Sequence, residues 1–117
     1  MDNKVIFLDI DGCLLKHHGG SSTSLIDITP ELLPGVREKL DEWEEKGYQI
    51  IITTGRKESL RKFTEKQLLS FGITYDMLIM GLIRGERIVI NDKKFDGTRT
   101  ASFVNIERNE GIGNLNL

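Results

Sequence analysis

Short apolar runs that alternate with helical patterns constrain the fold of this chain most strongly. The run VIFLDI (residues 5–10) is rich in strand-forming residues and is too short for a helix of its own. A second such run, YQIIITT (48–54), follows a segment between Pro34 and Gly47 in which apolar residues, Trp43 among them, recur at helical spacing. The order strand, helix, strand predicts a parallel sheet in an α/β fold.

The rest of the chain extends this pattern. The segment GRKESLRKFTEKQLLSFG predicts a second helix that ends at Gly72, and further strands are predicted at YDMLIM (75–80), RIVIN (87–91) and ASFVNI (101–106). The link between the third predicted strand (75–80) and the fourth (87–91) is too short for a crossover helix. We therefore expect one helical turn or an irregular link there. We predict a three-layer, Rossmann-like α/β fold with a parallel sheet.

Composition limits the number of domains and the class of partner. A chain of 117 residues predicts one domain, residues 1–117. The 16 basic and 18 acidic residues give a net charge of -2, so no broad basic field points to a nucleic acid. Cys13 is the only cysteine, which excludes an internal disulfide. With no apolar leader pattern and no stretch long enough for a membrane span, we expect a cytoplasmic protein without a membrane partner.

Polar residues follow three of the predicted strands at their carboxyl ends. Asp9 and Asp11 follow the first strand, Thr54 the second, and Asn91 and Asp92 the fourth. The carboxyl ends of parallel strands lie at one edge of the sheet, so we expect these side chains to converge. Crowded carboxylates raise one another's pKa unless a cation keeps them ionised, and oxygen ligands suit Mg²⁺. The convergence therefore predicts a magnesium site.

The same edge also offers groups that can bind and cleave a phosphate ester. Thr54 and the backbone amides of Gly55 and Arg56 precede a predicted helix, where free N–H groups favour an anion. Asp9 is placed to attack phosphorus and form an aspartyl phosphate. Asp11, two residues later, is placed as the general acid and base, a contribution of roughly 10²–10⁴-fold.

Gly12 lets the chain turn away after Asp11.

Three motifs of the sequence resemble those of the haloacid dehalogenase-like superfamily, whose members are mainly phosphatases. FLDIDGCL resembles the first motif, IIITTGR the second and IVINDKKFD the fourth, in the family's order. The resemblance implies an HAD-like hydrolase fold in which Asp9 is the nucleophile, Asp11 the general acid and base, and Thr54 the phosphate-binding hydroxyl. It also implies that Asp92 either binds Mg²⁺ directly or contacts a residue or water that does. The backbone carbonyl of Asp11 is implied as a further ligand.

The sequence departs from the family pattern at two places. The fourth motif has Asn91 before Asp92 where an acidic pair is frequent, so one metal ligand is a neutral amide unless Asp96 replaces it. The lysine of the third motif is not obvious. We favour Lys94 because it can fold back from its loop. Four other basic residues are alternatives: Arg56, Arg84, Arg87 and Lys93.

The family commonly adds a cap domain, whereas here only a flap at about residues 13–29 is available, a polar, glycine-bearing segment that predicts a mobile loop or short hairpin. The site is therefore expected to be open. The expected function is a magnesium-dependent phosphomonoesterase acting on a phosphorylated small metabolite, foremost a sugar phosphate. The alternatives are a polynucleotide-end phosphatase, since TTGRKESLRKFTEKQL also resembles such modules, and a catalytically silent phosphate-binding module. A homo-oligomer in which neighbouring flaps close the sites is a further hypothesis.

Simpler interpretations exist for several of these residues. Thr54 can merely cap the following helix. His17 and His18 are adjacent in a polar loop and are expected to lie in solvent rather than bind a metal. Nothing in the sequence around Cys13 promises a lowered pKa, so we expect it to fill space. Trp43 fits the apolar face of its helix, which predicts a place in the core.

Overall fold

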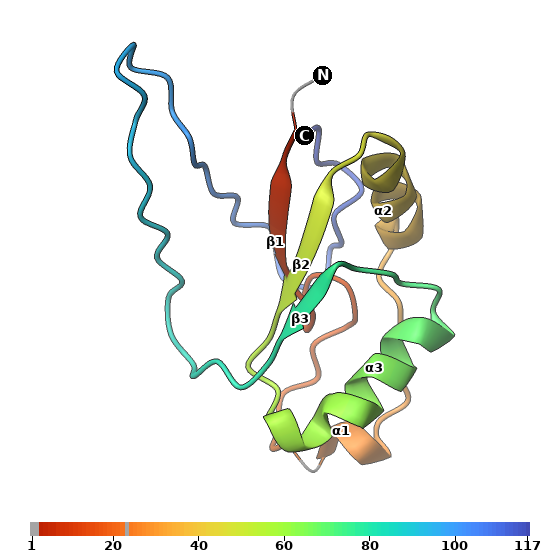
Figure 1. The fold of residues 1–117 in the computed structure, drawn as a ribbon. Helices are drawn as coiled ribbons and strands as arrows, with labels where there is room; N and C mark the ends of the chain where they lie inside the picture. Colours follow the sequence, from red (N-terminus) through yellow and green to blue (C-terminus); the bar gives the residue numbers. More distant parts are fainter. Residues whose placement is uncertain (1–2, 23) are drawn as a thin grey trace.

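The centre of the protein is a small parallel sheet. The structure, a computed structural model, describes residues 3–22 and 24–117. Strands β1 (Val5–Asp9), β2 (Gln49–Thr53) and β3 (Met77–Ile79) lie in the order β1-β2-β3 and run parallel (Figure 1). This small α/β fold is compatible with a Rossmann-like fold, and the first three predicted strands are confirmed, each within two residues of the expected ends.

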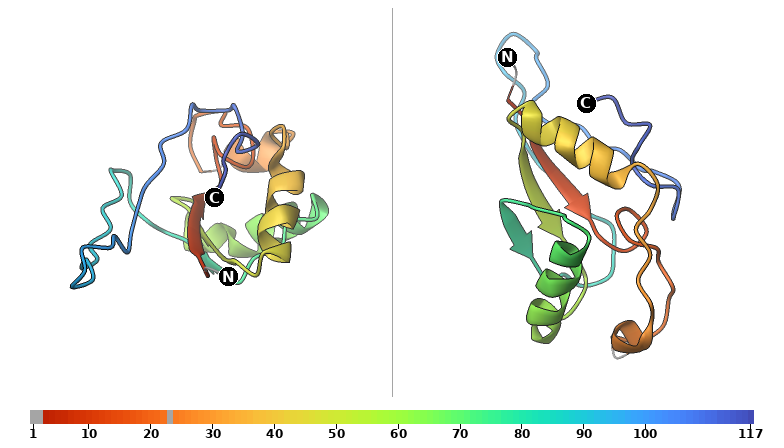
Figure 2. Two further views of the ribbon diagram at one scale, coloured as in Figure 1. Left: turned by 90° about the horizontal axis from the view of Figure 1, so that it is seen from above. Right: turned by 90° about the vertical axis from the view of Figure 1, so that its right-hand side faces the viewer.

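Two main helices cover one face of this sheet. Helix α2 (Val36–Glu45) joins β1 to β2, and the 3-10 turn η1 (Glu58–Leu60) with helix α3 (Arg61–Ser70) joins β2 to β3. Right-handed crossovers that advance in the same direction place both helices on the same side, as Figure 2 shows. Trp43 is fully buried in the core between sheet and helices, which confirms its predicted position.

The opposite face of the sheet has no helix on it in the described part of the chain. Leu8 of β1 points into the core, whereas Val5 and Phe7 on the other face are 50% and 61% exposed. On β3, Met77 and Ile79 are likewise exposed. Parallel sheets normally have both faces covered, because their crossover helices lie on both. The described residues therefore supply two of the three expected layers, and we call the uncovered side the open face.

The predicted strands at residues 87–91 and 101–106 are not formed, and this prediction was wrong. Residues 83 to 105 instead make a long extended arm in which every residue is exposed (Figure 1). A turn closes its tip, where the backbone N–H of Lys94 donates to the carbonyl of Thr98 at 3.0 Å. The apolar pattern is present, but a strand needs a neighbouring strand for its backbone hydrogen bonds, and the described residues form no strand paired with the arm.

The segments just before and just after the arm, residues 81–82 and 106–109, are called its roots. Both roots are hydrogen-bonded to loops at the carboxyl end of the sheet. On one side, the N–H groups of Gly81 and Leu82 donate to the carbonyls of Arg56 (2.8 Å) and Thr54 (3.2 Å). On the other, the N–H of Asn109 donates to the carbonyl of Gly12 at 2.9 Å. The arm therefore begins and ends beside the predicted site.

The flap and the tail pack beside these roots. Between residues 13 and 29 the structure has a tight turn and the short helix α1 (Ser24–Asp27), while Thr23 of the predicted flap lies outside the described residues. In the tail, Ile112 is buried, and Gly111 approaches Pro34 so closely that an added Cβ would lie 2.3 Å from the Pro34 carbonyl oxygen. Within the described part of the chain, no helix combines the length and the apolar character that crossing a membrane requires.

Candidate phosphate-transfer site

Asp9 and Asp11 lie at the carboxyl end of β1, as predicted. Asp9 is the last residue of the strand and pairs in register with Thr53 of β2, so the ends of the two strands are neighbours. The chain then turns at once, because the N–H groups of Cys13 and Leu14 both donate to the carbonyl of Ile10, at 3.1 and 2.8 Å. This turn lifts Asp11 out of the strand and over the sheet edge.

Gly12 is required at this turn. Its φ is +94°, a conformation that side chains rarely adopt, and an added Cβ would lie 3.2 Å from Cγ of Arg108. The sequence predicted a sharp turn after Asp11, and the structure adds that the C-terminal segment packs against it. Gly12 therefore serves the shape of the loop, and a phosphate would meet backbone rather than a side chain at this position.

The surroundings of Asp9 disfavour its ionised form. Loss of hydration raises the pKa of the Asp9 carboxyl above its ordinary 3.8, the hydrogen bond from the Ile10 N–H opposes this, and the nearby Asp11 adds to it. The charges of Arg87 and His17 act in the lowering direction. Among the candidate cations, Arg87 therefore lies near enough for its charge to lower the pKa of Asp9.

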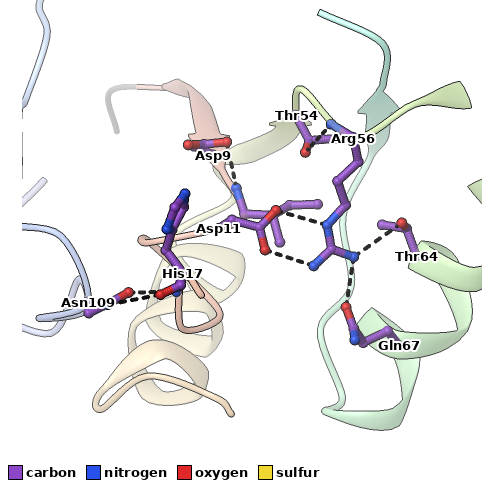
Figure 3. A network of polar contacts seen from close by, with 9 residues as sticks. Asp9, Asp11, His17, Thr54, Arg56, Thr64, Gln67 and Asn109 are labelled. Carbon is purple, nitrogen blue, oxygen red and sulfur yellow. Dashed lines mark hydrogen bonds and ion pairs between the residues drawn. The ribbon is translucent and has the colours of Figure 1, made fainter. Parts of the chain in front are cut away.

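Asp11 is held by a buried arginine (Figure 3). Nε and Nη2 of Arg56 donate to the two carboxylate oxygens of Asp11 at 2.9 and 2.8 Å, a bidentate ion pair. Nη1 of Arg56 donates to Thr64 Oγ1 and Gln67 Oε1 on α3, at 3.2 and 2.8 Å. The Arg56 side chain is only 3% exposed, whereas that of Asp11 is 23% exposed. Helix α3 therefore fixes the guanidinium, and the guanidinium fixes Asp11.

Thr54 completes the edge of the site from β2. It is buried, and its hydroxyl accepts a hydrogen bond from the backbone N–H of Arg56 at 3.1 Å. The following helix does not begin at Gly55 as expected, because η1 starts only at Glu58. The amides of Gly55 and Arg56 are therefore part of a loop, and the Arg56 amide already has a partner.

Cys13 agrees with its simpler interpretation, whereas His17 is half-buried and does not lie fully in solvent as expected. Burial, with Asp9 and Asp11 nearby, raises the pKa of the Cys13 thiol to about 11, so this thiol is a poor nucleophile at neutral pH. The backbone N–H of His17 donates to Oδ1 of Asn109 at 2.7 Å, which ties the start of the flap to the C-terminal segment. Sequence reasoning missed Asn109, Thr64 and Gln67, because no motif marks them and their partners lie far away in the chain.

The other predicted site residues lie apart from this edge. Asn91, Asp92, Lys94, Lys93 and Asp96 are all exposed on the arm, where Asp92 and Asn91 meet Thr100 across its two limbs. Within residues 3–22 and 24–117, no group of three His, Cys, Asp or Glu side chains could hold a metal ion. The chain brings together Asp9, Asp11, Gly12, Thr54, Gly55 and Arg56, and leaves the predicted fourth-strand group outside.

Chemically, this edge combines one carboxylate, that of Asp9, with a second carboxylate, that of Asp11, whose position is fixed. The structure describes a single hydrogen bond to the Asp9 carboxylate, from Ile10, so one of its oxygens is available to a ligand. The Asp11 carboxylate is oriented by a cation that could also bind an oxyanion. Both features suit transfer of a phosphoryl group.

Comparison with known proteins gives three findings. No family model matches the chain. The uncharacterized protein MJ0015 of Methanocaldococcus jannaschii is 42% identical over 71 residues, which are 61% of this chain and 65% of that protein, so this chain spans less than two thirds of its relative. A chain of the Pnkp1/Rnl/Hen1 complex is 28% identical with a TM-score of 0.59, over 74% of this chain and 30% of its own length. A Vibrio cholerae protein, 18% identical with a TM-score of 0.55, shares the fold over 97% of this chain and 90% of its own.

Proposed function

We propose that this chain is a phosphatase of the haloacid dehalogenase-like superfamily that hydrolyses a phosphorylated small metabolite, foremost a sugar phosphate, with the help of Mg²⁺. The observation that carries the proposal is the pair Asp9 and Asp11 at the carboxyl end of β1, beside Thr54 at the end of β2. The likeness to a chain of the Pnkp1/Rnl/Hen1 complex is consistent with a phosphatase-like module.

The proposed reaction has two steps. A carboxylate oxygen of Asp9 attacks phosphorus, the bond from phosphorus to the alkoxide oxygen breaks, and Asp11 gives its proton to that oxygen. Water then attacks the phosphorus of the aspartyl phosphate, Asp11 takes a proton from the water, and the carboxylate of Asp9 is released with inorganic phosphate. Asp9 therefore needs a free oxygen, which the geometry leaves to it.

Arg56 gives this scheme a control that the family motifs do not suggest. An Asp11 carboxylate bound through both oxygens to a guanidinium has neither oxygen free to contact the oxygen of a leaving group. A phosphate dianion that enters the site competes for the same guanidinium. We infer that substrate binding loosens the pair, and that an Asp11 oxygen then becomes free to take part in proton transfer.

Mg²⁺ fits the residues at this edge in part. Loss of hydration and the neighbouring Asp11 raise the pKa of Asp9, and a divalent cation beside these oxygens would favour the ionised form. The Asp9 carboxylate and the backbone carbonyl of Asp11 would hold the ion, with water completing its shell. When bound, the ion would neutralise charge on the phosphate; Asn91 and Asp92 lie on the arm and add nothing from the same copy.

A polynucleotide-end phosphatase is the second candidate. It is supported by the 28% identity to a chain of the Pnkp1/Rnl/Hen1 complex, together with the resemblance of residues 53–68 to the phosphatase modules of end-healing enzymes. The net charge of -2 argues against it, because binding to a nucleic-acid backbone depends on basic side chains.

The test is phosphate release from a panel of sugar phosphates, nucleotides and oligonucleotides with a 3′ or 5′ phosphate, with Mg²⁺ and with a chelator. We expect turnover that requires Mg²⁺, is abolished in Asp9→Asn and falls by about 10²–10⁴-fold in Asp11→Asn. Asp41→Asn, at an exposed position of α2, is the matched control and should keep its activity. The substrate that turns over fastest decides between the two candidates.

Binding should be measured beside activity. Addition of Mg²⁺ is expected to raise the melting temperature of the wild type and not that of Asp9→Asn, because a ligand of the folded state stabilises it. Protein that binds Mg²⁺ and a phosphate analogue but releases no phosphate from any substrate would replace the phosphatase with a catalytically silent binding module.

A further inference from the structure

The arm is an apolar structure without a partner. Its seven large apolar side chains are 53% to 114% exposed. They are, from root to root, Ile83, Ile88, Val89, Ile90, Phe95, Phe103 and Val104. Single exposed apolar residues are ordinary, but seven of them on one extended segment indicate an interaction surface.

The open face is a second apolar surface, on the body of the same chain. Val5 and Phe7 of β1 and Met77 and Ile79 of β3 are exposed there on both sides of β2. Strand β1 also lies at the edge of the sheet, since the order is β1-β2-β3, so one side of its backbone is free to pair. A free edge next to an uncovered apolar face is a docking surface for an extended apolar segment.

The excess surface of the chain matches an interface in size. The accessible surface is 8526 Å², whereas a compact monomer of 13.3 kDa exposes about 6,500 Å². The excess is about 2,000 Å² per copy, or about 4,000 Å² for two copies. Interfaces of permanent dimers bury about 2,000–5,000 Å² in total, so the excess lies within this range. The radius of gyration, 15.0 Å, also exceeds the roughly 13 Å of a compact chain of this length.

Charge indicates which partner the arm fits. The arm has five basic and three acidic residues, a net charge of +2, whereas the remainder of the chain has eleven basic and fifteen acidic residues, a net charge of -4. The body of a second copy therefore attracts the arm, and the attraction holds in both directions of an exchange. A twofold symmetric exchange uses the same two surfaces twice and closes after two copies.

We propose that two copies of this chain exchange arms, so that the arm of each lies along the β1 edge and over the open face of the other. If the run Ile88–Ile90 adds parallel to β1, the residues after it, Asn91 and Asp92, arrive at the carboxyl end of the partner's strand. The predicted fourth-strand group then reaches a candidate site from the neighbouring copy. The dimer itself does not depend on the proposed phosphatase activity.

The first test is the mass in solution, which needs no substrate. Sedimentation of the wild type should give twice 13.3 kDa. Val89→Asp with Phe103→Asp should give the monomer, with unchanged Trp43 fluorescence because both side chains are exposed in a single copy. Leu69→Asp changes a 70% exposed apolar residue of α3 and is the matched control, expected to stay dimeric. A monomeric wild type, or a dimer that survives the double substitution, would overturn the proposal.

The second test separates exchange from an arm that folds back on its own sheet. In a Cys13→Ser background, one variant receives Val89→Cys and another Phe7→Cys, and the two are mixed and treated with a short bis-maleimide. Exchange predicts a covalent dimer that contains one chain of each variant. If a single chain with both substitutions gives only an internally linked monomer, the arm covers its own sheet and the exchange is refuted.

Discussion

Replacement of Arg56 by Met removes the charge that organises the site and keeps most of the side-chain volume. The guanidinium donates two hydrogen bonds to Asp11 and one each to Thr64 and Gln67, from a side chain that is 3% exposed. Its loss leaves the Asp11 carboxylate without a cation and both α3 side chains without a donor. This perturbation is expected to lower stability more than any change of an exposed charge.

The size of the expected loss of stability follows from the burial of the Arg56 side chain. Removal of one partner from a buried ion pair costs about 3–5 kcal/mol, because the remaining charge is left uncompensated. Asp11 is 23% exposed, so water can partly rehydrate it. We therefore expect Arg56→Met to lower the free energy of unfolding by about 2–4 kcal/mol. For 117 residues this is a fall of about 8–16 °C in melting temperature.

Urea unfolding followed by the fluorescence of Trp43, the single tryptophan, measures this loss. All variants are compared at one protein concentration, since dimerisation would add to stability. Lys16→Met is the matched control: it breaks an exposed pair with Glu31 and should have a marginal effect.

A double-mutant cycle of Arg56→Met with Asp11→Asn isolates the pair itself. We expect a coupling energy of at least about 1.5 kcal/mol, in the range of residues that share a network. A coupling below about 0.5 kcal/mol would refute the reasoning, because the two side chains would then act independently in the folded protein.

Two further predictions concern Asp9 and the tail. Because the folded-state pKa of Asp9 lies above its ordinary 3.8, folding takes up a proton between these two values, and the ionised carboxylate lowers stability once the pH exceeds both. Asp9→Asn should therefore be more stable than the wild type in urea at pH 7 and equal to it below about pH 3; equal stability at pH 7 would show that water still hydrates this exposed carboxylate in the folded protein. Gly111→Ala should cost much more stability than Gly47→Ala, since both have positive φ but only at Gly111 does the new Cβ clash, 2.3 Å from Pro34 O. Similar melting temperatures for the two variants would show that the tail does not pack there.

Local patterns were enough to predict the first half of the fold. The ends of β1 and β2 are set by apolar runs that finish in polar residues, and α2 is set by helical spacing around Trp43. The position of Asp9 and Asp11 at a strand end follows from the same runs. These features depend on neighbours in sequence, which the sequence displays.

The second half depends on contacts that no local pattern displays. Residues 87–91 and 101–106 have strand composition, yet they form no strand, because in the part of the chain that the structure describes they pair with none of the three strands. The role of Arg56 as the partner of Asp11 was also missed, since the two are 45 residues apart and the motif only suggested a contact with substrate. In both cases the outcome depends on which residues, far apart in the sequence, lie next to each other in the folded chain.

The roots of the arm give its docking a second effect. Three backbone hydrogen bonds join these roots to the carbonyls of Thr54, Arg56 and Gly12, all in loops of the candidate site. Docking of the arm and binding at the site therefore share one set of loop conformations. By thermodynamic reciprocity, if arm docking raises the affinity for a ligand by some factor, the ligand strengthens the dimer by the same factor. The affinity of the candidate site would then depend on protein concentration, because its loops would be held by docked arms only where copies are abundant enough to form the dimer.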